Sequence, residues 1–157
     1  MTFERRFFLI SDKYEQYQAI RRKTDDEWNS AIDHCGMAKS QMMIIWTLWD
    51  FGRPCTQKEI CEDWYENKQT INSAAKKLEN EGIIEMIPSK ENFREKLMVF
   101  TEKGSAFAEK TVGKLVKAEK AAFDRFTEEE QKEILRLGRK HYELLKEEFD
   151  KLKGETK

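Results

Sequence analysis

Residues 67–84, NKQTINSAAKKLENEGII, separate into an apolar and a polar face when they are read at helical spacing. The apolar face contains Ile71, Ala74, Ala75 and Leu78, and the polar face contains Gln69, Asn72, Ser73 and Lys76. Gly82 follows, as glycine commonly does just after a helix, and residues 83–87 are mostly apolar. The pattern predicts a helix from about Lys68 to Glu81 that leads into a strand.

Apolar residues spaced three and four apart predict helices along most of the chain. The predicted helices cover about residues 11–35, 38–50, 56–64, 68–81, 101–126 and 127–152. Capping boxes, in which a threonine is followed three residues later by glutamate, mark the starts at Thr56 and Thr127. A further pair, Thr24 with Glu27, could restart the first helix.

The last two predicted helices each carry an apolar stripe, and we expect the first of the two stripes to be buried. The stripes consist of Phe107, Val112, Leu115, Ala118, Ala122 and Phe126, and of Ile134, Leu135, Gly138, Tyr142, Leu145, Phe149 and Leu152.

Two short apolar runs, residues 83–87 and 97–100, flank the polar stretch 88–95 and predict a β-hairpin. A hairpin alone is marginally stable in water, so this one must pack on the short helices before it. The fold class is therefore mainly α: a winged helix-turn-helix with a two-stranded β-wing, flanked by long terminal helices that form a dimerisation region. We expect residues 1–36 and 102–157 to dimerise and residues 37–101 to bind DNA.

The polar face of the helix at 68–81 suits base reading in a major groove, because glutamine and asparagine pair with adenine and lysine with guanine or phosphate. The base-reading candidates are Gln69, Asn72, Ser73 and Lys76. The candidates for phosphate contacts are Thr56, Lys58, Lys68, Thr70 and Lys77. The alternative is an ordinary solvated face, which most surface helices have.

The predicted wing carries Lys90, Arg94 and Lys96, and an arginine at a hairpin tip can enter a narrow minor groove. Glu91 and Glu95 lie among these cations, so a merely solvated hairpin is the alternative.

The net charge of −1 gives no support for a protein that coats nucleic acid. Residues 53–103 carry nine basic and ten acidic residues, so only segregation of charge in three dimensions could create a DNA-binding face. A winged-helix module that binds protein instead of DNA remains the alternative. No apolar run approaches the ~18 residues of a membrane helix, and the expected location is cytoplasmic.

Other chemistry has weak support. The three cysteines form no CxxC motif, and the two histidines lie far apart, so we expect neither metal nor cofactor. No catalytic constellation is recognisable, and we do not expect an enzyme. Cys55, beside Arg53 and before a helix start, is the best candidate for a redox-sensitive thiol, although ordinary core or surface thiols are more common.

Trp28, Trp46 and Trp49 could line an effector pocket between the dimerisation helices and the winged unit. Aromatic residues at helical spacing are also typical of a protein core.

In their order and spacing, several segments resemble the MarR family of bacterial transcription regulators. CGMAKSQMMIIWTLWDFGRPCTQKEI resembles the segment that opens the family's second and third helices. QTINSAAKKLENEGIIE resembles its recognition helix, and ENFREKLMVFTEKG resembles its wing and the start of the fifth helix.

This resemblance implies a homodimer that binds a pseudo-palindromic operator in double-stranded DNA. It further implies a repressor released by a small, often phenolic, effector or by thiol oxidation. Arg94 matches the family's wing arginine, but Asn92 replaces the aspartate that usually pairs with it, and Glu85 replaces a frequent basic residue.

The aromatic residues of the terminal helices support dimerisation independently, since a small winged domain cannot cover all of them. They include Phe3, Phe7, Phe8, Phe123, Phe126, Tyr142 and Phe149. A monomeric helical bundle is the alternative.

Overall fold

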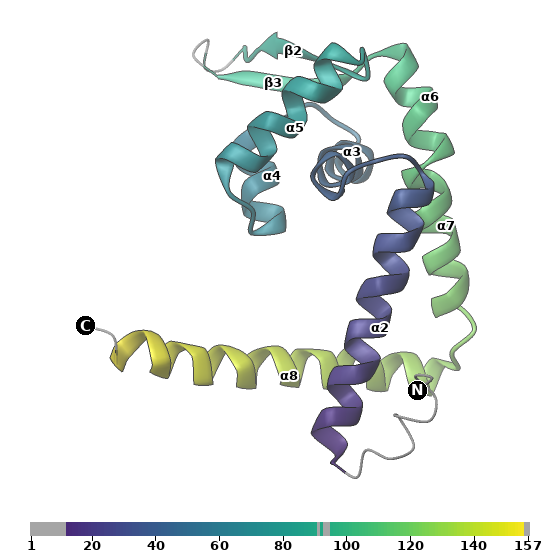
Figure 1. The fold of residues 1–157 in the computed structure, drawn as a ribbon, viewed down its shortest axis with the longest axis vertical. Coiled ribbons are helices and arrows are strands. Elements are labelled where there is room, and N and C mark those ends of the chain that lie inside the picture. Colours follow the sequence, from purple (N-terminus) through teal and green to yellow (C-terminus); the bar gives the residue numbers. More distant parts are fainter. Residues whose placement is uncertain (1–11, 91, 93–94, 156–157) are drawn as a thin grey trace. The chain divides into compact units, whose positions relative to one another are not determined.

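A computed structural model describes residues 12–90, 92 and 95–155 (Figure 1). Its contacts divide the chain into two compact units, Met1–Leu115 and Val116–Lys157, which are described separately below. The elements in chain order are α2 (Lys13–His34), α3 (Lys39–Phe51), β1 (Cys55–Thr56), α4 (Gln57–Trp64), α5 (Lys68–Asn80), β2 (Ile84–Pro88), β3 (Lys96–Phe100), α6 (Glu102–Lys110), α7 (Val112–Phe123) and α8 (Glu128–Glu155).

The core of the first unit lies where α3, α4 and α5 meet the sheet. The largest fully buried side chains of this core include Ile44, Ile45, Ile60, Ile71, Leu78, Ile84 and Met98. All four residues of the apolar face predicted for residues 68–81 are buried in α5. The helix-turn-helix and its wing are therefore confirmed as one packed unit.

The wing strands β2 and β3 pair antiparallel, from Ile84 opposite Phe100 to Pro88 opposite Lys96. The sheet contains a third strand, because β1 pairs with β3 and gives the order β1-β3-β2. The predicted two-stranded sheet was thus one strand short. A strand of two residues is too short to show the alternation of side chains by which strands are recognised in sequence.

The start of α6 is fixed against the turn that follows α5. Gly82 adopts φ of +69° there, a left-handed conformation that glycine accepts easily. Thr101 donates from Oγ1 to the Gly82 carbonyl oxygen at 2.7 Å and accepts from the Gly104 amide at 2.9 Å. A Cβ atom at Gly104 would lie 1.8 Å from the carbonyl oxygen of Ile83, so only glycine permits this approach.

The helix predicted over residues 101–126 was wrong in its continuity, because the chain breaks at Thr111 with φ of −115° and ψ of −86°. Close packing supports this break: Gly113, just after it, brings the α7 backbone against the ring of Trp49, where an added Cβ would lie 3.2 Å away. The predicted restart within the first helix was also wrong. The Thr24 hydroxyl donates a hydrogen bond to the Ile20 carbonyl oxygen at 3.2 Å, and α2 continues through this position without a break.

The apolar stripe predicted to be buried over residues 101–126 is buried only in its first half in this single chain, and most of the stripe of α8 is exposed. Val112 is buried, and Phe107 and Leu115 are half-buried, but Ala118, Ala122 and Phe126 are exposed. On α8, Leu135, Tyr142 and Phe149 are 55%, 63% and 53% exposed. The capping box at Thr127 is confirmed, since the Thr127 amide donates to Glu130 Oε2 at 2.8 Å and the Glu130 amide donates back. Among the described residues, none of the helices has the length and apolar character that crossing a bilayer requires.

Candidate nucleic-acid interface

Helix α5 presents the predicted polar face to solvent. Asn67 caps its start, because Oδ1 accepts from the Thr70 amide at 2.9 Å. Gln69, Ser73 and Lys76 are exposed and Asn72 is half-buried. Three of the four candidates for base reading are therefore open to solvent, and Asn72 lies at the margin of the face towards α4.

A groove of about 400 Å³ lies beside this polar face and is formed by α4, α5 and the wing strands. Its lining residues are Thr56, Gln57, Lys58, Lys68, Asn72, Lys76, Glu79, Met86, Glu95 and Lys96. Four lysines from three elements thus converge, although the complete winged segment carries a slight excess of acidic residues. Glu79 and Glu95 offset part of this positive charge. The segregation of charge that a DNA-binding face needs is partial.

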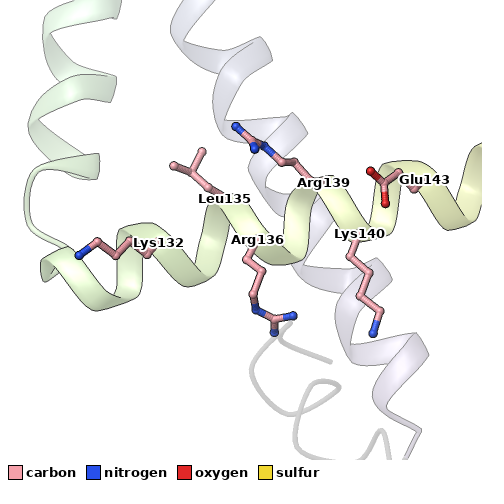
Figure 2. Close-up of a pocket in the computed structure, with 6 residues that line it drawn as sticks. All are labelled: Lys132, Leu135, Arg136, Arg139, Lys140 and Glu143. Carbon is pink, nitrogen blue, oxygen red and sulfur yellow. The ribbon is translucent and has the colours of Figure 1, made fainter.

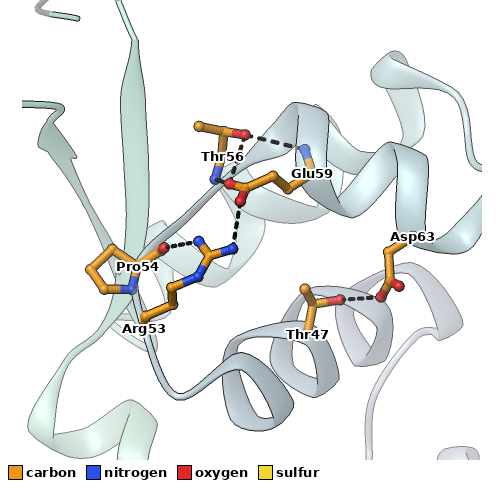
Figure 3. A network of polar contacts seen from close by, with 6 residues as sticks. All are labelled: Thr47, Arg53, Pro54, Thr56, Glu59 and Asp63. Atoms are coloured by element: carbon orange, nitrogen blue, oxygen red, sulfur yellow. Dashed lines mark hydrogen bonds and ion pairs between the residues drawn. The ribbon is translucent and has the colours of Figure 1, made fainter. Parts of the chain in front are cut away.

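The start of α4 is held by a network of polar contacts (Figure 3). Thr56 and Glu59 form the predicted capping box: the Glu59 amide donates to Thr56 Oγ1 at 3.1 Å, and the Thr56 amide donates to Glu59 Oε2 at 2.7 Å. Arg53 donates to the other carboxylate oxygen of Glu59 at 2.8 Å and to the Pro54 carbonyl oxygen at 2.9 Å. These hydrogen bonds hold the pKa of Glu59 below its usual value despite the opposing effect of burial. The first turn of α4 is therefore fixed in place.

The candidates for phosphate contacts differ in their surroundings. The hydroxyl of Thr56 is engaged within the capping box, since it accepts from the Glu59 amide and donates to Glu59 Oε2 at 3.0 Å. Lys58 lies 3.7 Å from Glu62 and Lys77 lies 4.0 Å from Glu81. Such exposed ion pairs are weak, so these lysines can still turn to phosphate. Lys68 is exposed and Thr70 is half-buried.

The wing brings one predicted cation to the groove. Lys96 at the start of β3 lines it, and Lys90 is exposed in the loop after β2. The loop closes on itself, with the Ser89 amide donating to the Glu95 carbonyl oxygen at 3.0 Å and the Glu95 amide to that of Asn92 at 2.8 Å. Arg94 lies outside the described residues.

Of the three tryptophans predicted to line an effector pocket, the structure brings two together. The rings of Trp28 and Trp46 meet edge to face with centroids 5.9 Å apart, and Trp64 continues this arrangement at 6.4 Å from Trp46. Trp49 instead contacts Gly113. The sequence interpretation missed Trp64, which extends the cluster from α2 through α3 to α4.

Cys55 is a poor redox sensor in this structure. Its side chain is fully buried in β1. Burial raises the pKa of the thiol to about 12, and Glu59 and Asp63 add to this effect while Arg53 opposes it. Loss of hydration outweighs the nearby cation here, which favours the alternative of an ordinary core thiol.

A second hollow lies on α8 and carries Lys132, Leu135, Arg136, Arg139, Lys140 and Glu143 (Figure 2). In Figure 2 these side chains diverge from one helix, with Arg139 on one side and Arg136 and Lys140 on the other. Arg136 is paired with Glu133 at 2.6 Å, which raises the arginine pKa. This hollow is thus a charged helix surface, in contrast to the groove at α5, which residues of several helices and strands line.

Comparison with known proteins gives a match for the segment of the chain that forms this groove. Residues 37–104 match the family model described as a winged helix DNA-binding domain. No curated protein sequence shows significant similarity to the chain.

Several solved structures share the fold over most of their length. The MarR family regulator NMB1585 from Neisseria meningitidis is 21% identical with a TM-score of 0.74, and the match covers 89% of this chain and 98% of that one. MepR of S. aureus in complex with DNA is 16% identical with a TM-score of 0.66, over 87% and 99% of the two chains. The regulator PcaV from Streptomyces coelicolor, bound to its natural ligand, is 13% identical with a TM-score of 0.65, over 85% and 96%.

The family model and the fold agree on the same part of the molecule, in which α5 is the second helix of the helix-turn-helix and β2 and β3 form the wing. Residues 37–104 therefore match the winged helix DNA-binding domain in sequence model and in fold, and the chain shares its overall topology with MarR family regulators.

Proposed function

We propose that this protein is a MarR-type transcription regulator that binds a specific pseudo-palindromic operator in double-stranded DNA as a homodimer. One observation carries the proposal: α5 buries its apolar face and presents amides, a hydroxyl and a lysine beside a groove that four lysines line. A helix with this polar face fits the major groove, and lysines at its margin suit the flanking phosphates.

The parts of the interface have separate roles in this proposal. Gln69, Asn72, Ser73 and Lys76 read base edges, while Lys58, Lys68 and Lys77 contact phosphates, with Thr56 and Thr70 beside them. Lys90, Arg94 and Lys96 place the wing at the adjacent minor groove. Base contacts supply sequence preference, and phosphate contacts supply most of the affinity and its dependence on salt.

The apolar stripe of α8 supports the homodimer. Leu135, Gly138, Tyr142, Leu145 and Phe149 recur at alternating spacings of three and four, which is the pattern of helices that pair along a seam. Three of them are more than half exposed in the single chain. Covering them with a second copy would present two α5 helices to DNA, about 34 Å apart if they read successive major grooves.

Regulation by a small aromatic effector completes the proposal, with repression as the direction of control. PcaV, which shares the fold, was solved with its natural ligand. The Trp28–Trp46 pair is half-buried and joins α2 to α3, so a ligand that displaced either ring would change how α2 meets the winged domain. Neither a cofactor nor catalysis is part of the proposal.

A protein-interaction module is the second candidate, and Glu79 and Glu95 in the groove favour it. Selecting ligands from random duplexes, followed by fluorescence anisotropy at increasing salt, separates the two. A DNA-binding regulator will enrich a two-fold symmetric sequence and lose affinity linearly in log–log form as salt rises. A protein that enriches no sequence and does not bind duplex at low salt is not such a regulator.

A further inference from the structure

The side chains of Gln57 and Asn72 meet at the groove. Gln57 Nε2 donates to Asn72 Oδ1 at 3.4 Å, across a separation of 15 residues in sequence. Both residues line the groove, and both are half-buried. An amide of the supporting helix thus contacts an amide of the helix proposed to read DNA.

Neighbouring contacts fix the backbone at both ends of this hydrogen bond. Gln57 is the first residue of α4, directly after Thr56, whose capping box with Glu59 and Arg53 fixes that turn. Asn72 follows Ile71, which is fully buried and anchors α5 in the core. The contact therefore constrains the Asn72 carboxamide more than solvent would.

We propose that Gln57 is a positioning residue that sets the base preference of Asn72, by holding its carboxamide oxygen toward α4 and its amino group toward the duplex. This inference rests on the proposed DNA-binding function. Gln57 itself need not touch a base for this role.

The preference follows from the donor and acceptor patterns of the bases. An unconstrained asparagine suits adenine, because its oxygen accepts from N6–H while its amino group donates to N7. When Gln57 occupies the oxygen of Asn72, the amino group with its two donors is the better-presented part. Guanine offers two acceptors, N7 and O6, and matches those donors. The pair is therefore expected to favour guanine over adenine where Asn72 reads.

The contact can be tested without DNA by NMR of the Asn72 side-chain NH2 group. In the native protein, 15N relaxation should report a more ordered Asn72 amino group than in Gln57→Met, which keeps the length of the side chain but not the donor. Lys58→Met, one residue further along α4, serves as the matched control and should leave the Asn72 signals unchanged. Identical relaxation in the native protein and Gln57→Met would overturn the inference.

The effect on specificity is tested with the selected operator and its three variants at the base pair that Asn72→Ala identifies. Gln57→Met should reduce the preference for guanine over adenine roughly two- to tenfold, the effect of one net hydrogen bond. The reduction should vanish in the Asn72→Ala background, because a coupled pair is not additive. Lys58→Met should instead weaken binding to all variants equally.

The outcomes are separable. A uniform loss of affinity in Gln57→Met, with the base preference intact, would show that Gln57 contacts phosphate and overturn the inference while DNA binding stands. A native protein that binds no duplex would remove the proposed function, and with it the role in base preference, while the relaxation measurement would still decide the contact itself. Thermal unfolding of each variant checks that it is folded.

Discussion

The indole Nε1 of Trp64 donates a hydrogen bond of 2.8 Å to the hydroxyl of Thr47. Thr47 is buried and in turn donates to Asp63 Oδ2 at 3.3 Å (Figure 3). The hydroxyl thus joins α3 to α4 within the first unit. Because Trp64 also packs on Trp46, this hydrogen bond helps to fix the position of α4 against α3.

Replacing Thr47 with valine keeps the shape of the side chain but leaves the Trp64 N–H without its acceptor. A polar group buried without a partner costs about 1–3 kcal/mol, so Thr47→Val should lower the free energy of unfolding by that amount in urea titrations. In a Trp64→Phe background, which lacks the indole N–H, Thr47→Val should lower the free energy of unfolding much less. Equal losses in both backgrounds would show that the hydrogen bond does not stabilise the fold.

Gly104 should tolerate no larger side chain. A Cβ there would lie 1.8 Å from the backbone oxygen of Ile83, which cannot move without disturbing the turn into β2. We expect Gly104→Ala to destabilise the protein by about 3 kcal/mol or more, at or above the upper end of ordinary overpacking. Gly154→Ala is the control, because nothing lies within 4 Å of a Cβ at Gly154. Similar unfolding midpoints for the two variants would contradict the close approach of α6.

Cys55 should resist thiol reagents in the folded protein. At pH 8, mass mapping after brief alkylation should find Cys35 and Cys61, which are half-buried, modified before the fully buried Cys55. Denaturant should abolish the difference. Early modification of Cys55 would show that its β1 environment opens readily.

The same burial predicts a dependence of stability on pH. The pKa of Cys55 is about 12 in the folded protein against 9.0 for the free group, so the folded state keeps a proton that the unfolded state loses above pH 9. The free energy of unfolding should therefore fall as pH rises from about 9 towards 12, by at most about 1.4 kcal/mol per pH unit from this group. Urea titrations of the native protein and Cys55→Ala should show a smaller decline in the variant, and equal slopes would refute the raised pKa.

Lysines of the groove should contribute to DNA affinity through counterion release. Lys58→Ala and Lys68→Ala should each weaken binding to the selected operator and reduce the salt slope by about 1. Lys110→Ala, on α6 and absent from the groove lining, is the matched control. If all three variants bound alike, the duplex would have to lie elsewhere.

A negative charge in the apolar stripe of α8 should dissociate the proposed homodimer. In sedimentation velocity, we expect Leu135→Glu and Phe149→Glu to shift the protein from dimer to monomer, because each buries a carboxylate against apolar neighbours. Leu144→Glu changes a leucine that is 51% exposed but lies outside the repeating positions, and it should leave the dimer largely intact. Dimers of equal stability in all three variants would place the interface on another surface.

Features that depend on neighbours in sequence were predictable. The capping boxes at Thr56 and Thr127 join residues three apart, and the structure contains both. The two faces of α5 follow from the periodicity of one segment, and Gly82 ended it as expected. The wing hairpin was predictable for the same reason, since its strands are separated by a short polar loop.

Features that depend on distant neighbours were not. The contact of Gln57 with Asn72 spans 15 residues, and β1 exists only because β3 lies beside it. The periodicity of residues 101–126 predicted one continuous helix. The structure breaks it at Thr111, next to the close packing of Gly113 on Trp49. The burial of Cys55 was unpredictable for the same reason, because a cation nearby in sequence says nothing about burial.

By itself, the sequence determined which segments are helical, where most of them begin, and which face of α5 is apolar, because these depend on spacing and on hydrogen bonds between near neighbours. Only the tertiary structure decided which polar groups share the groove, how closely α6 approaches Ile83, and whether the Cys55 thiol is exposed to solvent. Those properties arise when segments far apart in the chain exclude solvent together, and the pattern within any one segment does not contain them.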